Sequence, residues 1–234
     1  MGYVKWLGHA AFEVSLDGYT VLIDPWLTNP LSPVKDINEY RGKIDLIIVT
    51  HDHGDHLGEA VKLLEINPNA KFASVYETAN RVAEELTRAG VKTDERIIGG
   101  NIGGPMRIPG IKLEVILVPA HHSSEKGTPV GVVIVGKEAT IYHAGDTGLV
   151  AEMQFVGELY KPDIALLPIG GHFTMDAIQA TKAVELIRPK VAIPMHYNTF
   201  PPIKADPEEF KRLVEEKKLG TRVVILKPGE KYEF

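Results

Sequence analysis

"THDHGDHLGEA", residues 50–60, places three histidines and two aspartates within seven consecutive positions. Directly before it, residues 43–50 ("KIDLIIVT") form a near-continuous apolar run, which is typical of a strand buried on both faces. Proteins of mixed α and β structure commonly bind ligands at the carboxyl ends of such strands. Imidazole and carboxylate groups are ligands for divalent metals. The stretch therefore predicts a metal site on a loop that follows a buried strand.

The spacing within this loop is suited to two metal ions. His51 and His53 lie two positions apart and can point at one ion, whereas Asp55 and His56 fall in the first turn of the next helix and can reach a second. Such groups bind zinc at about 2.0–2.2 Å. Four ligands from one loop cannot close around two ions, so we expect partners from elsewhere in the chain.

Three later segments supply candidate partners, and each follows an apolar run that resembles a strand: "VPAHHSS", "IYHAGDTG" and "IPMHYNTF". Their candidate ligands are His121, His122, His143, Asp146 and His196. Taken singly, a histidine after a strand is more often a hydrogen-bonding group, and aspartate before Thr-Gly is usually a turn former. Taken together with the H-x-H-x-D-H loop, they predict one site at the edge of a sheet.

The composition limits what can hold the metal and where the protein works. The chain has no cysteine, so disulfides and thiolate ligands are excluded, and imidazole and carboxylate must bind the metal alone. The formal net charge of −5 argues against a nucleic-acid backbone as the main partner. No apolar run approaches the ~18 residues of a membrane helix, and no signal peptide is visible. We therefore expect a cytoplasmic protein without a membrane partner.

Short β-like runs alternate with amphipathic helical stretches along the chain. Strands are expected at 3–6, 12–15, 21–24, 43–50, 71–75, 111–118, 130–135, 140–143, 163–168, 191–194 and 222–226, and helices directly after the metal loop and at 78–89, 152–159, 176–187 and 207–217. Residues 28–43 and the glycine-rich residues 99–104 are expected to be loops, and the latter lack the Lys-Ser/Thr of a phosphate-binding loop. No linker divides the chain, so residues 1–234 are predicted to form one domain.

"THDHGDH", a histidine after a strand, "HAGDT" and "PMHYNTFP" resemble, in this order, the metallo-β-lactamase superfamily. The flanking "WLGHAAF", "VLIDPW", "HHSS" and "LLPIGGHFTMD" are similar to metal-dependent hydrolases related to L-ascorbate-6-phosphate lactonase. The resemblance covers nearly the whole chain. It implies an α+β fold, namely an αββα sandwich of two mixed β-sheets flanked by helices, with a dinuclear metal site along one sheet edge.

The resemblance also implies a role for each candidate. The ligands of the first ion would be His51, His53 and His122, those of the second Asp55, His56 and His196, and Asp146 would bridge both. The implied catalytic residues are Asp55, Asp146 and His9, the last of which matches a position near the site. Asp24 either orients a ligating imidazole or ends a strand in a turn. Cleft and turn roles are both open for the remaining polar candidates, which are Ser123, Ser124, His172 and Asn198.

A dinuclear site of this kind predicts hydrolysis. Two divalent ions about 3.5–4 Å apart can share a water and lower its pKa from about 15.7 towards 7, which gives a nucleophile without serine or cysteine. The resemblance implies a small-molecule substrate with a lactone or a phosphorylated sugar group, and dinuclear chemistry also suits phosphodiesters. Zinc is the favoured metal for histidine and carboxylate ligands, and manganese, iron and nickel are alternatives. A homo-oligomer is expected from the resemblance alone.

Two other functions are consistent with the same residues. The first is a nuclease that acts on RNA or DNA ends, although relatives of that kind carry an extra clamping domain. The second is a metal-binding or sensing module without turnover. The loss of a metal ligand would favour this function, but all seven expected ligand positions are filled.

Overall fold

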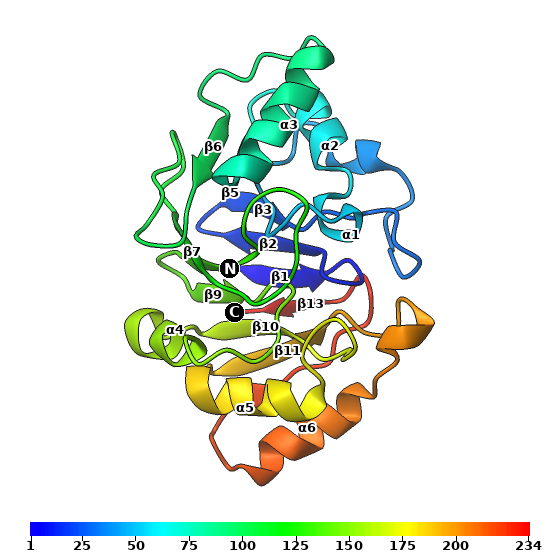
Figure 1. Cartoon of the computed structure of the whole chain (residues 1–234), viewed down its shortest axis with the longest axis vertical. Helices are drawn as coiled ribbons and strands as arrows, with labels where there is room; N and C mark the ends of the chain where they lie inside the picture. Colours follow the sequence, from blue (N-terminus) through cyan, green and yellow to red (C-terminus); the bar gives the residue numbers. More distant parts are fainter.

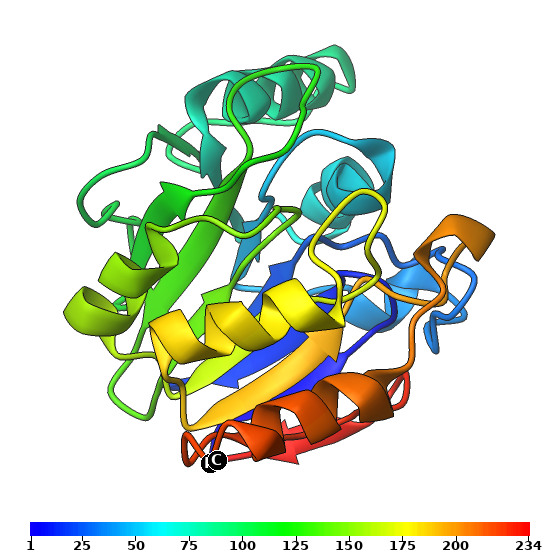
Figure 2. The same cartoon turned by 60° about the horizontal axis from the view of Figure 1, so that its bottom comes forward.

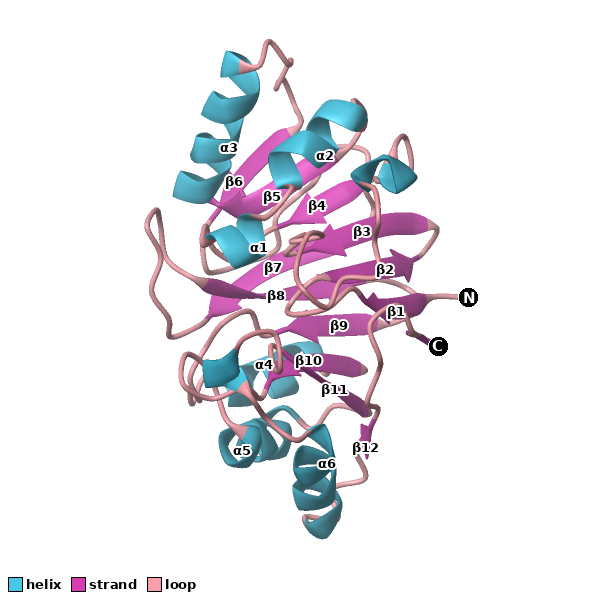
Figure 3. Ribbon diagram, turned by 90° about the vertical axis from the view of Figure 1, so that its right-hand side faces the viewer, coloured by secondary structure: helices cyan, strands magenta, loops and turns pink.

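Two β-sheets stacked face to face form the centre of the computed structural model, which describes residues 1–234. Helices cover the outer face of each sheet, so that the layers follow the order helix, sheet, sheet, helix (Figures 1 and 3). The first sheet has seven strands in the order β13-β1-β2-β3-β4-β5-β6, and the second has six in the order β12-β11-β10-β9-β8-β7. Both sheets are mixed, as the resemblance implies.

The first sheet is antiparallel from β13 to β3 and parallel from β3 to β6. Its strands are β1 (Tyr3–Trp6), β2 (Phe12–Leu16), β3 (Tyr19–Ile23), β4 (Leu46–Ile48), β5 (Lys71–Val75), β6 (Ile97–Gly100) and β13 (Lys231–Glu233). In the second sheet, β9 to β12 are parallel, and β7 and β8 are antiparallel. Its strands are β7 (Glu114–Pro119), β8 (Val130–Val135), β9 (Thr140–His143), β10 (Ile164–Pro168), β11 (Val191–Met195) and β12 (Arg222–Val223).

The apolar run before the metal loop is buried on both faces of the first sheet, as predicted. In β4, Leu46 and Ile48 belong to the large apolar cluster between the sheets, whereas Ile47 belongs to a smaller cluster under the outer helices. This division follows from the two-residue period of a strand, which sends successive side chains to opposite faces. Each such buried side chain stabilises the fold by about 1.5–3 kcal/mol relative to exposure.

Helices on the first sheet are α2 (Ala60–Ile66) and α3 (Tyr76–Arg88), together with the 3-10 turn η1 (Ile37–Tyr40). The short helix α1 (Gly54–Leu57) begins directly after the metal loop. The second sheet is covered by α4 (Met153–Tyr160), α5 (Ala177–Ile187) and α6 (Pro207–Glu216), and a second 3-10 turn, η2 (Pro201–Ile203), follows β11 (Figure 2). No helix has both the length and the apolar character that crossing a membrane requires.

The loops after many strands meet at one edge of the molecule because of strand direction. In the first sheet β1, β3, β4 and β5 run the same way, and in the second sheet β7, β9, β10 and β11 do. Backbone hydrogen bonds join the two edges, from Val130 N to Thr50 O at 3.1 Å and from His196 N to His9 O at 3.0 Å. Segments distant in sequence therefore converge at the carboxyl ends of both sheets.

Most predicted elements are present, with a few corrections. The expected helix after the metal loop is two helices, because Gly58 between α1 and α2 has φ +46° and approaches the backbone of Trp26. Residues 28–43 contain η1, and the glycine-rich loop overlaps β6. The predicted strands at 43–50, 111–118 and 222–226 are confined to Leu46–Ile48, Glu114–Pro119 and Arg222–Val223.

Strand β13 was not predicted, since "KYE" shows no apolar alternation and the strand forms only by pairing with β1. This pairing brings the amino- and carboxyl-terminal ends of the chain close together, as Figure 1 shows.

Candidate metal centre

The predicted ligands converge at the shared edge in two groups of side chains. The first group is His51, His53 and His122, and the second group is His9, Asp55, His56 and His196. A third set, His51, His56 and Asp146, overlaps both groups. Within each group, the nitrogen and oxygen atoms that could bind a metal lie within 4.8 Å of one another. The structure therefore brings together all seven predicted ligands, with Asp146 between the groups, and adds His9 to the second.

The metal loop presents its side chains as the spacing predicts. After β4, His53 caps α1, and Asp55 and His56 lie in that helix. His51 Nε2 lies 3.0 Å from His53 Nδ1, and His51 Nδ1 lies 3.1 Å from the Thr50 hydroxyl. The rings of this pair therefore face the space that His122 closes from the loop after β7.

Asp146 connects the two groups from the turn after β9. Its Oδ2 lies 3.4 Å from His122 Nε2 and 3.1 Å from His196 Nε2, and its Oδ1 lies 3.2 Å from His56 Nε2. Its side chain is 3% exposed. One buried carboxylate thus contacts imidazoles of both groups, which is the arrangement expected of a bridging ligand.

Several buried polar atoms at this point have no hydrogen-bond partner. They are His56 Nε2, Asp146 Oδ1 and both ring nitrogens of His196. A buried polar atom without a partner costs about 1–3 kcal/mol, so native proteins rarely retain several together. These atoms are the imidazole and carboxylate donors that divalent metals bind. The residues present therefore fit a metal ion.

Asp24 holds one of the ligating imidazoles in place. Its buried carboxylate accepts hydrogen bonds from Thr50 N at 2.8 Å, from the Thr50 hydroxyl at 2.7 Å and from His56 Nδ1 at 2.7 Å. With Nδ1 engaged, His56 presents Nε2 to Asp146. Of the two roles considered from the sequence, the structure gives Asp24 the orienting one, which such carboxylates commonly have.

The charges of the site shift the titration of its buried groups. Burial alone would lower the pKa of His56, but the negative charges of Asp146 and Asp24 outweigh it and raise this pKa well above its usual value. Burial and then the nearby His56 lower the pKa of His51 to about 3. This shift favours the protonated form of His56 beside the two aspartates. A metal ion bound through Nε2 would require the neutral ring, because a ligating imidazole must be neutral.

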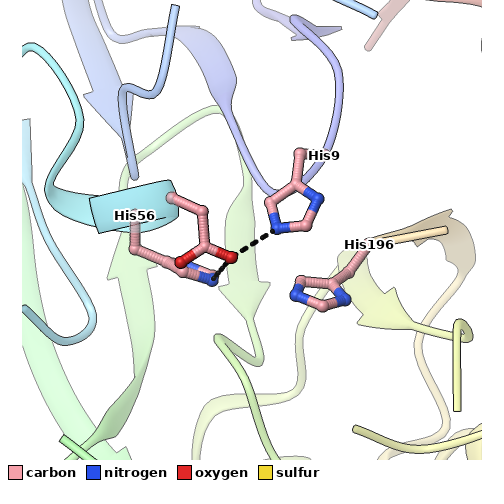
Figure 4. A group of neighbouring side chains, drawn as sticks. His9, His56 and His196 are labelled. Carbon is pink, nitrogen blue, oxygen red and sulfur yellow. Dashed lines mark hydrogen bonds and ion pairs between the residues drawn. The ribbon is translucent and has the colours of Figure 1, made fainter. Parts of the chain in front are cut away.

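His9 is the member of the second group that was not predicted as a ligand, and it lies near the site as the resemblance implies. The rings of His9, His56 and His196 point toward one another (Figure 4), and those of His9 and His196 have centroids 4.0 Å apart. His9 Nε2 lies 3.1 Å from Asp55 Oδ2, and His9 Nδ1 lies 2.9 Å from the Thr199 hydroxyl. Both ring nitrogens are therefore engaged, and the direct contact of His9 is with a predicted ligand.

His121 and His143 lie outside both groups. His121 is exposed, and its backbone N donates to the Thr147 hydroxyl. His143 is fully buried, where Nδ1 accepts from Gly145 N at 3.0 Å and Nε2 therefore donates to Ala10 O at 2.9 Å. His143 thus joins the Asp146 turn to the His9 loop and has no free nitrogen for a metal.

The remaining polar candidates differ in their exposure and contacts. His172 and Ser123 are exposed, and Asn198 accepts a hydrogen bond from a backbone amide of the next turn. Ser124 donates to Asp52. None of these side chains belongs to a potential metal group.

The sequence analysis did not single out three residues that the structure places beside the ligands. Thr50 contacts His51 and Asp24, Thr199 contacts His9, and Asp52 binds the segment that follows His122. Thr50 and Asp52 are adjacent in sequence to His51, and Thr199 lies three positions after His196. That proximity in sequence is the signal that could have identified them.

Comparison with known proteins agrees with this architecture. Residues 19–197 match the family model described as a β-lactamase superfamily domain. A UPF0173 metal-dependent hydrolase of Hyperthermus butylicus is 71% identical over 234 residues, and the match spans 100% of both chains. Two stacked mixed sheets with a histidine and aspartate site at one edge define the metallo-β-lactamase fold. The chain belongs to the β-lactamase superfamily, within its UPF0173 metal-dependent hydrolases, and is a metal-dependent hydrolase.

Solved structures share the fold. Igni18, a metallo hydrolase from the hyperthermophilic archaeon Ignicoccus hospitalis, superposes with a TM-score of 0.88 at 47% identity, covering 100% of this chain and 99% of that one. An isothiocyanate hydrolase from Delia radicum gut bacteria has a TM-score of 0.75 at 19% identity, with coverage of 99% and 98%. The second likeness concerns the fold alone. The predicted fold class and family are both confirmed.

Proposed function

We propose that the chain is a dinuclear hydrolase that cleaves an ester-type bond, in a lactone or a phosphodiester, of a small molecule. The observation that carries the proposal is the Asp146 carboxylate, which lies within 3.4 Å of ring nitrogens from both groups. In this proposal the first ion is held by His51, His53 and His122, the second by Asp55, His56 and His196, and Asp146 bridges them. Because both sheets contribute ligands, residues 1–234 act as one hydrolase domain.

The metals would supply the nucleophile and the electrophilic assistance. Two divalent ions in such a site act as Lewis acids and lower the pKa of a bound water, so a serine or cysteine nucleophile is unnecessary. A donor set rich in imidazole favours zinc, with manganese, iron and nickel as alternatives.

Asp55 is the carboxylate best placed to contact substrate or an incoming water. Its side chain is 30% exposed, whereas those of Asp146 and Asp24 are 3% and 0% exposed. Burial would raise the pKa of Asp55, but the hydrogen bond from His9 and the positive charge of His56 hold it below its usual value. Asp55 is therefore ionised at neutral pH and can accept a hydrogen bond from a substrate or an incoming water.

His9 keeps Asp55 in position and does so as a neutral ring. Burial lowers the pKa of His9 to about 4, so at neutral pH the ring carries one proton. When Nε2–H donates to Asp55, Nδ1 accepts from the Thr199 hydroxyl, which satisfies both nitrogens. His9 acts in this proposal by orienting the catalytic carboxylate.

The test is an activity assay on metal-reconstituted protein with two substrate panels side by side. One panel holds a generic phosphodiester and the other a series of lactones, each with zinc and with manganese. We expect turnover in at least one panel, and the Asp146→Ala variant should lose it by roughly 100-fold or more, since a ligand common to both ions is removed.

Three other results would contradict the proposal. Full metal occupancy without turnover in either panel would favour a binding or sensing role. Turnover confined to RNA or DNA ends would favour a nuclease. Activity retained in Asp146→Ala would exclude the bridged site.

A further inference from the structure

Asp52 lies between His51 and His53, yet its carboxylate belongs to neither potential metal group. The side chain is fully buried, with 0% exposure. A buried carboxylate is costly unless hydrogen bonds and an opposite charge compensate it. Its partners therefore indicate what this residue does.

Three donors from two separate segments surround this carboxylate. Arg81 Nη1, on α3, donates to Oδ2 at 2.9 Å. The Ser124 hydroxyl donates to Oδ1 at 2.7 Å, and Glu125 N donates to the same oxygen at 2.9 Å. Ser124 and Glu125 directly follow His122 and its neighbour in the connection from β7 to β8. Asp52 thus ties the loop of His51 and His53 to the segment that carries His122.

The segment at His122 has no regular secondary structure to position it. Residues 120–129 form neither helix nor strand. On the amino-terminal side of His122, the backbone of His121 bonds to the Thr147 hydroxyl and to Gly148 N. Those bonds connect the segment to the Asp146 turn, whereas Asp52 connects it to the two histidines of the first group.

We propose that Asp52 is a positioning residue that holds His122 against His51 and His53, and that it thereby sets the affinity of the first group for its metal ion. This inference rests on the proposed two-metal function and extends it to one site in particular. Asp52 acts only through the hydrogen bonds to the His122 segment. Its removal weakens the first site and leaves the second, where Asp24 has the equivalent task for His56, in place.

The first measurement is metal affinity, independent of activity. Purified Asp52→Asn protein is loaded with zinc, and bound metal is followed by elemental analysis during titration with a chelator. We expect one of the two ions to be released at a chelator concentration lower by roughly 10–100-fold, the usual effect of losing a residue that supports a ligand. The other ion should be released as in the unaltered protein.

Double variants identify the ion that is affected. His122→Ala removes a first-group ligand and His196→Ala a second-group ligand, so each defines a reference. Because residues that act together are not additive, Asp52→Asn should cause no further loss in the His122→Ala background. In the His196→Ala background it should weaken the one ion that remains.

Two single variants separate positioning from general stability. Ser124→Ala removes a bond on the His122 side of Asp52 and should weaken the same ion, to a smaller degree. Arg81→Gln removes the α3 bond to Asp52 and a 3.6 Å ion pair with the exposed Glu125 side chain, but it keeps the Ser124 and Glu125 N bonds to Asp52. Because an exposed ion pair contributes little, this variant should lower the melting temperature while the metal affinity stays unchanged. If Asp52→Asn fails to fold, the Ser124→Ala and Arg81→Gln pair tests the inference.

The inference is overturned if Asp52→Asn binds both ions with unchanged affinity, or if it weakens both equally. The equal loss would indicate a structural role only. Failure of the proposed two-metal site is a different result, since the unaltered protein would then bind fewer than two ions before any variant is made. Absence of turnover with two bound ions would contradict the proposed hydrolysis and leave this inference about metal affinity to be decided by the titrations.

Discussion

At His9 the backbone has φ +53°, and the same left-handed conformation occurs at Asp24 and His196, with φ +47° and +55°. Asp24 and His196 directly follow β3 and β11, and His9 lies in the turn between β1 and β2. For residues other than glycine this conformation costs about 1–3 kcal/mol and is concentrated at functional sites. The cost is offset here because the turn directs a ring or carboxylate of each residue into the site.

The contacts of His9 lead to a prediction at the residue scale. His9→Ala should lower kcat/KM by about 10–100-fold, because Asp55 loses the donor that orients it, while both ions stay bound. Steady-state kinetics together with elemental analysis of the same samples would measure this. Thr199→Val is the matched control and should have a smaller effect, since it removes only the donor to Nδ1. Loss of an ion from His9→Ala would instead make His9 a ligand.

The junction between α1 and α2 shows what one glycine decides at the scale of elements. The sequence pattern after the metal loop indicates a single helix, whereas the chain turns at Gly58, where a Cβ atom would lie 2.4 Å from Trp26 Cα. The turn leaves α1 short and directs Asp55 and His56 to the site. A local pattern of apolar residues does not report this close approach of two backbones.

Two glycines of the same segment give matched variants for this element. Gly58→Ala should destabilise the protein by about 2 kcal/mol or more, because alanine disfavours φ +46° and its Cβ would overlap Trp26. Gly54→Ala, where nothing lies within 4 Å, should be neutral or stabilise by about 0.5–1 kcal/mol. Denaturant unfolding of the metal-free proteins measures both. Equal unfolding free energies for the two variants would contradict this account.

At the scale of the whole molecule, the metal site joins two sheets whose other contacts are mainly apolar. The predicted ligands, from the loops of both sheets, surround the buried atoms that have no partner, and in the proposed site a metal ion would satisfy them. Metal removal should therefore lower the stability of the whole fold. Compared with protein in metal present at about 100 times its dissociation constant, metal-free protein should have a free energy of unfolding lower by about 2.7 kcal/mol.

Thermal unfolding with and without a chelator measures this loss. For a chain of this size, we expect the melting temperature to fall by roughly 5–10 °C and to recover when zinc is added back. Asp146→Ala should melt at a temperature that responds little to chelator or metal. Identical melting curves for loaded and metal-free protein would contradict a stabilising role of the site.

The sequence alone determined the general class of this protein. The run at 43–50 and the loop that follows it predict a buried strand with metal ligands at its end, and the later histidine turns predict distant partners. These are local properties: apolar periodicity is set by burial within one strand, and the spacing of ligands is set by one loop. The order of these motifs resembles the metallo-β-lactamase superfamily, and it is this resemblance that implied the fold class and the family.

Only the tertiary structure decided which polar groups are free to act. His143 was as good a candidate as its neighbours until its contact with Ala10, 133 positions away in sequence, engaged its second nitrogen. His9 depends in the same way on Thr199, 190 positions away, and Asp52 on Ser124. Which ring nitrogens and carboxylate oxygens remain for a metal depends on the neighbours that engage them. For these residues the neighbours are brought by the packing of the two sheets rather than by the local sequence.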